Sequence, residues 1–164
     1  MIPSLKSALL AVSLVAVGSA ALAEGSSKDI VDTAISAGNF TTLVKALQTA
    51  DLVKTLKGNG PFTVFAPDDA AFARIPSTSL NDILSNKARL TNLLKYHIVR
   101  AKVDSREAAR VGTVNTLEGD VLTIDANGKT LTVEGATITK PDIQCKNGVI
   151  HVIDTVLQPT DKLQ

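Results

Sequence analysis

Apolar residues recur at helical spacing through the first half of the chain. Phe40, Leu43, Val44 and Leu47 stand at i, i+3, i+4 and i+7, which predicts a helix with one buried face that Asn39 caps. Asp29 opens an earlier helical pattern that Gly38 ends. Shorter helical stretches follow at 52–56, 79–84 and 90–94, with Ser79 placed to start the second of them.

The second half of the chain changes to short segments rich in Thr and Val. Turn-forming Gly pairs separate them, and the predicted strands cover residues 114–117, 121–124, 130–133, 136–139 and 149–153. The last of these is apolar on both faces, which is typical of a central strand covered on both sides. Helices first and a strand meander second predict an α+β fold, with antiparallel sheets and helices packed against one side.

A sharp strand-to-helix turn lies between Gly60 and Phe72. Phe62 to Phe65 form an aromatic and β-branched run, and Pro67 ends it because proline has no N–H to donate. Asp68 then has the right position and side chain to cap a short helix. We expect Phe65, Pro67 and Asp68 to hold this part of the core together.

The N-terminus has the three parts of a secretory signal peptide. Lys6 precedes an apolar run, and Ala21-Leu22-Ala23 supplies a cleavage motif. We therefore predict a signal peptide at 1–23 cleaved after Ala23, a flexible leader at 24–28, one domain at 29–160 and a tail at 161–164. The expected setting is secreted or periplasmic, with no integral membrane segment after cleavage.

Charge excludes some partners. The full chain has 17 basic and 16 acidic residues, and removal of Lys6 with the signal leaves 16 of each. A balanced chain of this kind argues against nucleic acid or an anionic membrane as partner, because both need basic surfaces.

Candidate catalytic groups are few. His97 and His151 are the only histidines, and pairing with Asp142 or Asp154 would be needed for acid–base or metal chemistry. His151 alternates with Val149 and Ile153, which favours a structural place in the core instead. No nucleophile, phosphate-binding or metal motif is present, so we predict no enzyme activity, no cofactor and no metal site.

Two features remain open from the residues alone. Cys145 is the single cysteine, and it is either a small buried side chain or a thiol for an intermolecular disulfide. Lys140-Pro141-Asp142-Ile143 is the best surface candidate, because proline limits the entropy lost when a charge and an apolar anchor bind. Alternatively, Ile143 points inward and Asp142 stabilises a turn.

Three stretches in order give the chain a family resemblance. Residues 63–72 (TVFAPDDAAF), 93–99 (LLKYHIV) and 147–159 (NGVIHVIDTVLQP) resemble the signatures of the fasciclin-type adhesion domain. The resemblance implies a two-sheet antiparallel β-sandwich, shaped as a wedge and flanked by helices. It also implies a non-enzymatic protein that binds a protein or polysaccharide at a cell surface; the alternatives are a small-ligand binding protein and, less favoured, a hydrolase.

The resemblance extends to two candidate contact motifs. In animal members, a Tyr-His pair and an Asp-Ile pair are implicated in integrin binding, and here they match Tyr96-His97 and Asp142-Ile143. Gln144 and Cys145 depart from the family pattern that follows the Asp-Ile pair. The resemblance names no partner and no oligomeric state.

Overall fold

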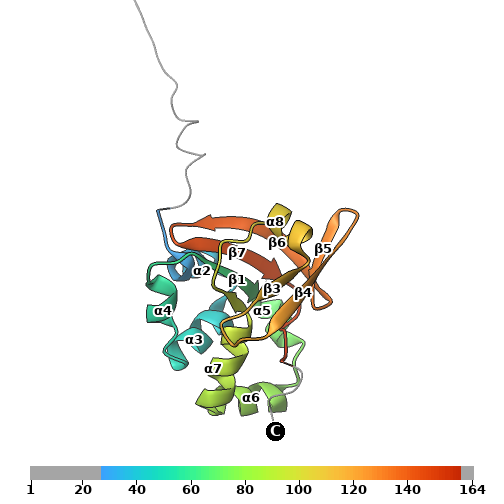
Figure 1. Ribbon diagram of the computed structural model, residues 1–164. Coiled ribbons are helices and arrows are strands. Elements are labelled where there is room, and N and C mark those ends of the chain that lie inside the picture. Colours follow the sequence, from blue (N-terminus) through green and yellow to red (C-terminus); the bar gives the residue numbers. More distant parts are fainter. Residues whose placement is uncertain (1–26, 160–164) are drawn as a thin grey trace, which may run out of the picture.

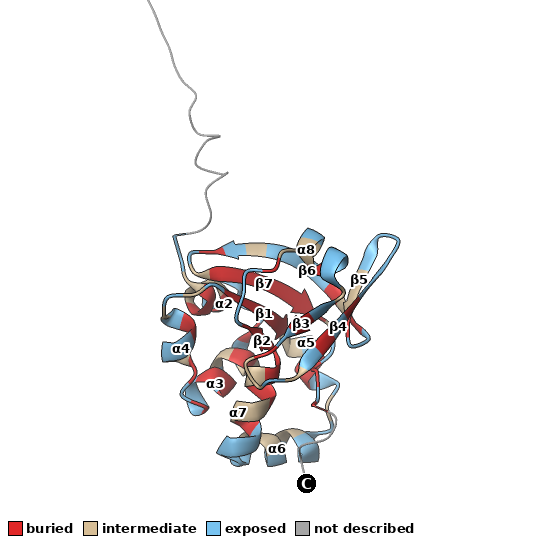
Figure 2. Cartoon of the chain, in the orientation of Figure 1, coloured by how far each residue is buried: buried red, intermediate tan, exposed pale blue. Residues whose placement is uncertain are grey.

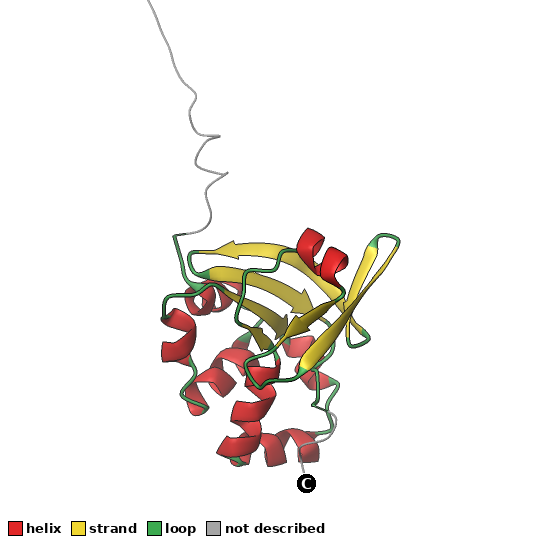
Figure 3. Cartoon of the chain, viewed as in Figure 1, coloured by secondary structure: helices red, strands yellow, loops and turns green. Residues whose placement is uncertain are grey.

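Seven helices and seven strands are formed by residues 27–159, which are the residues that the computed structural model describes (Figures 1 and 3). The helices are α2 (Ile30–Ala37), α3 (Thr41–Thr49), α4 (Val53–Lys57), α5 (Asp69–Ala73), α6 (Ser77–Ser85), α7 (Lys87–Tyr96) and α8 (Ser105–Val111). The strands are β1 (Phe62–Pro67), β2 (Ile98–Val99), β3 (Thr113–Asn115), β4 (Val121–Asn127), β5 (Thr130–Val133), β6 (Ala136–Cys145) and β7 (Gly148–Ile153). The predicted signal peptide and C-terminal tail lie outside the described residues.

The strands form one sheet in the order β2-β1-β7-β6-β5-β4-β3. All pairings are antiparallel except that of β1 with β7, which is parallel and places Phe65 beside His151. The predicted α+β class is confirmed. The parallel pair corrects the expectation of a wholly antiparallel arrangement, and it arises because the intervening helices and meander carry the chain back to the same end of the sheet.

The sheet curls until its two edge strands meet. Val99 in β2 forms an isolated bridge with Thr116, just after β3, and the Leu117 N–H donates to the Ile98 carbonyl at 2.8 Å. The long strand β6 belongs to both halves of the curled sheet, so the two sheets of the expected wedge are continuous through it. Irregular register in β6 between Ile138 and Ile143 marks a bulge.

Two apolar cores lie on the two faces of β1 and β7. Phe62, Val64 and Ala66 of β1 join the core beneath the helices, whereas Phe65 joins the core inside the curled sheet. Every residue of β7 is buried, and the strand is coloured as buried along its whole length in Figure 2. The predicted central, doubly covered strand is therefore confirmed.

Helices α2 to α7 gather on one side of the sheet, and α8 lies at the opposite side near β6 (Figure 1). The predicted caps differ in outcome. Asp68 caps α5 by accepting a hydrogen bond from the Ala71 N–H at 2.8 Å, as expected.

The expected cap of α3 was wrong. The residue at that position is Phe40, and no side chain next to it in sequence caps the helix. Asp69 of α5 does this from outside, accepting from the N–H groups of Thr42 at 2.9 Å and Thr41 at 3.3 Å. The carboxylate of one helix thus caps another.

Helix α6 also differs from the sequence prediction. It begins at Ser77 directly after Pro76, two residues before the predicted start at Ser79. Among residues 27–159, no helix is long and apolar enough to cross a membrane.

Candidate binding surface

The bulge of β6 presents the predicted surface motif. Pro141 and Asp142 are exposed, and Asp142 has a left-handed backbone with φ of 59°. Such a conformation is uncommon for a residue with a Cβ, although Asp tolerates it better than most. Ile143 is half-buried, pairs with Ile150 of β7 and packs on the core beneath the helices. We call Lys140–Ile143 the β6 corner.

Hydrogen bonds fix Asp142 on both its backbone and its side chain. Its carboxylate accepts from the Ser105 N–H at 2.8 Å and contacts the Ser105 hydroxyl, at the first residue of α8. Its own N–H donates to Nδ1 of His151 at 3.2 Å. Both α8 and β7 therefore hold Asp142 in position in the free protein.

His151 supports this corner from the interior. The side chain is fully buried, stacks on Phe65 with ring centroids 5.5 Å apart, and donates from Nε2 to the Val103 carbonyl at 2.7 Å. Since Nδ1 accepts the Asp142 N–H, the ring is the neutral Nε2–H tautomer. Burial lowers the pKa of His151, and the hydrogen bond to Val103 only partly offsets this.

His97 has a comparable place at the end of α7. Its Nδ1 donates to the Leu93 carbonyl at 2.8 Å, and its Nε2 accepts from the Leu157 N–H at 2.9 Å. Burial lowers its pKa to about 4. The ring therefore ties the helix to the C-terminal segment in its neutral form.

Tyr96 lies edge-on to His97, with the ring centroids 6.4 Å apart. Its pKa is raised by burial and, to a smaller extent, by Glu134 and Asp120. Tyr96 is 5% exposed and His97 2% exposed. Within residues 27–159 neither shares a hydrogen bond or ring contact with Asp142 or Ile143, so the two predicted motifs are separate features.

The arrangement of Ser105, Asp142 and His151 does not form a catalytic triad. The carboxylate bonds the serine rather than the histidine, and both ring nitrogens of His151 are bound to backbone groups. The His151 ring therefore does not contact the serine hydroxyl and is not placed to take its proton, as the histidine of a triad does. Within the described residues, no group of three His, Cys, Asp or Glu side chains is placed to hold a metal ion.

The Cys145 thiol is buried, and burial raises its pKa. A thiol in this state is a poor nucleophile, since the thiolate is the reactive form. The side chain contacts the Ile143 carbonyl through a long sulfur hydrogen bond of 3.6 Å.

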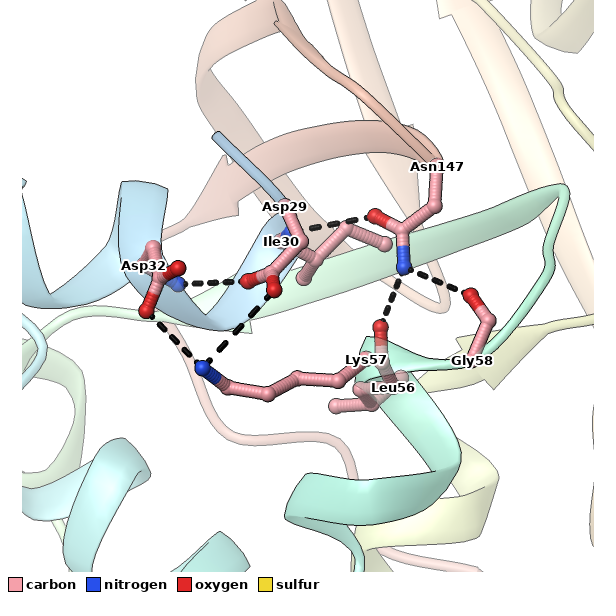
Figure 4. Close-up of polar contacts among 7 residues, drawn as sticks. All are labelled: Asp29, Ile30, Asp32, Leu56, Lys57, Gly58 and Asn147. Atoms are coloured by element: carbon pink, nitrogen blue, oxygen red, sulfur yellow. Dashed lines mark hydrogen bonds and ion pairs between the residues drawn. The ribbon is translucent and has the colours of Figure 1, made fainter. Parts of the chain in front are cut away.

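Sequence reasoning missed the role of Asn147. Its side-chain oxygen accepts from the Ile30 N–H at 3.1 Å, and its amide donates to the carbonyls of Leu56 and of Gly58, the latter at 3.1 Å (Figure 4). One side chain thereby joins α2, α4 and the β6–β7 turn. The sequence predicts the Asn-Gly turn but carries no signal for these distant partners.

Ser105 was missed for a similar reason. It sits in a polar segment with weak helical periodicity, and only the folded chain brings it to Asp142. A Ser after Asp104 is a recognisable helix start, and that pattern could have located α8.

In this domain His97, His151 and Asn147 form hydrogen bonds that hold the fold together. Similarity to known proteins shows the family. Residues 38–159 match the family model of the fasciclin domain, and the chain belongs to this family. The resemblance predicted from three sequence stretches is thereby confirmed.

Relatives include bacterial and animal proteins. An uncharacterized Synechocystis protein, sll1735, is 42% identical over 129 residues, covering 79% of this chain and 96% of its own length. The pig transforming growth factor-beta-induced protein ig-h3 is 35% identical over 130 residues, which are 79% of this chain but 19% of that protein.

A solved structure has the same fold. The FAS1 domain pair of the insect cell adhesion molecule fasciclin I superposes with a TM-score of 0.62 at 20% identity, covering 74% of this chain and 46% of that one. At this identity the likeness speaks for the fold alone.

Proposed function

We propose that this chain is a non-enzymatic, exported adhesion module that binds a protein or polysaccharide at a cell surface or envelope through the β6 corner. The observation that carries the proposal is the exposed, preorganised Asp142, held by Ser105 on one side and by buried His151 on the other. A contact that is rigid before binding loses little entropy when its partner arrives.

Membership of the fasciclin family supports adhesion as the class of function. The solved relative fasciclin I is a cell adhesion molecule, and the relative ig-h3 is a growth-factor-induced protein of which this chain matches one part. Export is supported by the N-terminal sequence, whose predicted cleavage after Ala23 would release a chain starting at Glu24.

We infer that Tyr96 and His97 stabilise the fold and do not contact the partner. With 5% and 2% of their surfaces exposed, they offer almost nothing for a partner to touch. Their hydrogen bonds and packing instead fix the end of α7 and the C-terminal segment.

The test compares attachment and stability for three variants. Attachment of the mature protein to cells or envelope fragments of the producing organism would be measured beside urea unfolding. Asp142→Asn keeps a side-chain acceptor for Ser105 and tolerates the left-handed backbone, so it should fold while losing the charge. We expect attachment to weaken about tenfold, equivalent to about 1.4 kcal/mol.

Asp125→Asn is the matched control, because Asp125 is an exposed aspartate on β4 that lies outside the corner. Ile143→Ala should weaken attachment and also lower stability, since the side chain is half-buried against the core. Unchanged attachment of Asp142→Asn, or an equal loss in Asp125→Asn, would contradict a contact at the β6 corner.

A further inference from the structure

A polar cavity of about 410 Å³ opens between the α4–β1 loop and the β6–β7 turn. Its volume lies within the usual range for small-molecule sites. It shares no lining residue with the β6 corner. The cavity residues are Asp29, Lys57, Gly58, Asn59, Gly60, Pro61, Lys102, Cys145, Lys146, Asn147 and Gly148.

Three lysines line this cavity against a single carboxylate. Lys57 is already compensated, because it bonds Asp32 at 3.0 Å and lies 3.8 Å from Asp29 (Figure 4). Lys102 and Lys146 are exposed, and neither forms an ion pair with any residue among 27–159. Two lysines that form no ion pair within residues 27–159 therefore line a space of ligand size.

The walls of the cavity are fixed by its glycines and by Asn147. A Cβ at Gly60 would collide with the Asn147 carbonyl, and one at Gly148 would collide with the Phe62 carbonyl. Asn147 also uses both amide hydrogens and its oxygen on backbone groups of α2 and α4 (Figure 4). Both of its amide hydrogens are thus used, and the side chain holds the α4–β1 loop in place.

The remaining lining is polar rather than apolar. Apart from Pro61 and buried Cys145, it consists of glycines, Asn59, Asn147 and charged side chains. Glycines leave backbone groups accessible, and these with Asn59 suit hydroxyl groups, whereas the lysines suit an anion. An apolar ligand would find few partners here.

We propose that this cavity binds an acidic sugar, with Lys102 and Lys146 contacting its anionic group and the α4–β1 loop at 58–61 contacting its hydroxyls. The anion is a carboxylate or a sulfate, and the sugar is either free or a unit of an acidic polysaccharide. The site is independent of the adhesive corner, so either can fail without the other.

The test uses the mature chain with defined probes. Galacturonate, polygalacturonate, dextran sulfate, neutral galactose and inorganic sulfate would be titrated, and binding followed by amide chemical shifts and calorimetry. We expect saturable binding of an acidic sugar, with shifts at residues 57–61 and 145–148, and weaker binding as salt rises. Monomer and polymer arms separate a free sugar from a polysaccharide, and the uronate and dextran sulfate arms separate the two anions.

Lys102→Gln and Lys146→Gln remove the charges at nearly constant size. Each should weaken binding about fivefold, and the pair more than tenfold, whereas Lys129→Gln removes an exposed lysine of the β4–β5 turn and should change nothing. Asp142→Asn should also leave sugar binding intact. Thermal melts would verify that all variants fold.

Three results would overturn the proposal. The first is binding of galactose or inorganic sulfate as strong as that of every acidic sugar probe. The second is an equal loss in Lys129→Gln, which indicates diffuse charge attraction. The third is no saturable binding of any acidic sugar.

Discussion

Two buried histidines form hydrogen bonds that require a neutral ring. Each ring has one nitrogen donating to a carbonyl and the other accepting a backbone N–H. Protonation would turn the accepting nitrogen into a donor that faces another donor. Burial therefore keeps both rings neutral, and at His151 it outweighs the opposing effects of the Val103 hydrogen bond and of the Asp142 and Asp104 carboxylates.

This arrangement predicts a loss of stability in mild acid. The pKa of His97 is about 4 in the folded protein and about 6.5 when unfolded, so between these values the unfolded chain binds more protons. The stability gained from the neutral ring is fully present above about pH 6.5 and falls as the pH drops toward 4. The full effect is about 3 kcal/mol, and the lowered pKa of His151 acts in the same direction.

Urea unfolding at pH 7, 5.5 and 4.5 would measure this loss. His97→Asn should be less stable than the parent at pH 7 but should show a shallower decline with acid. An identical decline in parent and variant would mean that His97 does not titrate with the folding equilibrium.

At the scale of elements, the sequence predicts which helices and strands form better than it predicts how the strands pair. Apolar periodicity located α2 and α3, and the β-rich meander located β3 to β7, because burial of one face leaves a visible pattern. The two-residue strand β2 and helix α8 were missed. A strand this short and a helix with one buried residue leave almost no apolar pattern in the sequence.

The end of β6 and the contacts of the β6 corner were also not predicted from the sequence. The predicted strand ended at Thr139, yet β6 continues to Cys145 because a bulge places Pro141 where no ladder bond is required. The motif itself was recognisable, but its support by Ser105 and His151 depends on contacts 37 and 9 residues away. Local patterns do not encode such distances.

The contribution of the Asp69 cap to the stability of α3 can be tested by mutation. The pKa of Asp69 is subject to a rise from partial burial, but hydrogen bonds from the Thr42 and Thr41 N–H groups lower it overall. Asp69→Ala should leave both N–H groups without that acceptor and cost about 1–2 kcal/mol. Asp82→Ala is the control, because Asp82 is an exposed aspartate within α6.

Urea melts of the two variants would decide the matter. Equal stability of Asp69→Ala and Asp82→Ala would show that the link between α5 and α3 adds nothing. A selective loss of amide protection at the start of α3 would locate the effect in the cap.

The whole molecule joins two cores through one central pair of strands. β1 and β7 are buried on both faces, the helices cover one side, and the curled meander covers the other. This construction leaves β6 as the strand that carries both candidate surfaces, with the corner near its middle and Cys145 at the end beside the cavity. A partner at the corner would therefore touch an exposed stretch of β6, next to β7, which is buried along its whole length (Figure 2).

Amide hydrogen exchange is the most direct test of whether the β6 corner is the adhesive contact. The mature protein would be labelled free in solution and attached to envelope fragments of the producing organism. We predict added protection concentrated at residues 138–145 and at the start of α8, with residues 30–49 of α2 and α3 unchanged. Protection confined to α2 and α3, with none at the corner, would show that the adhesive contact lies elsewhere.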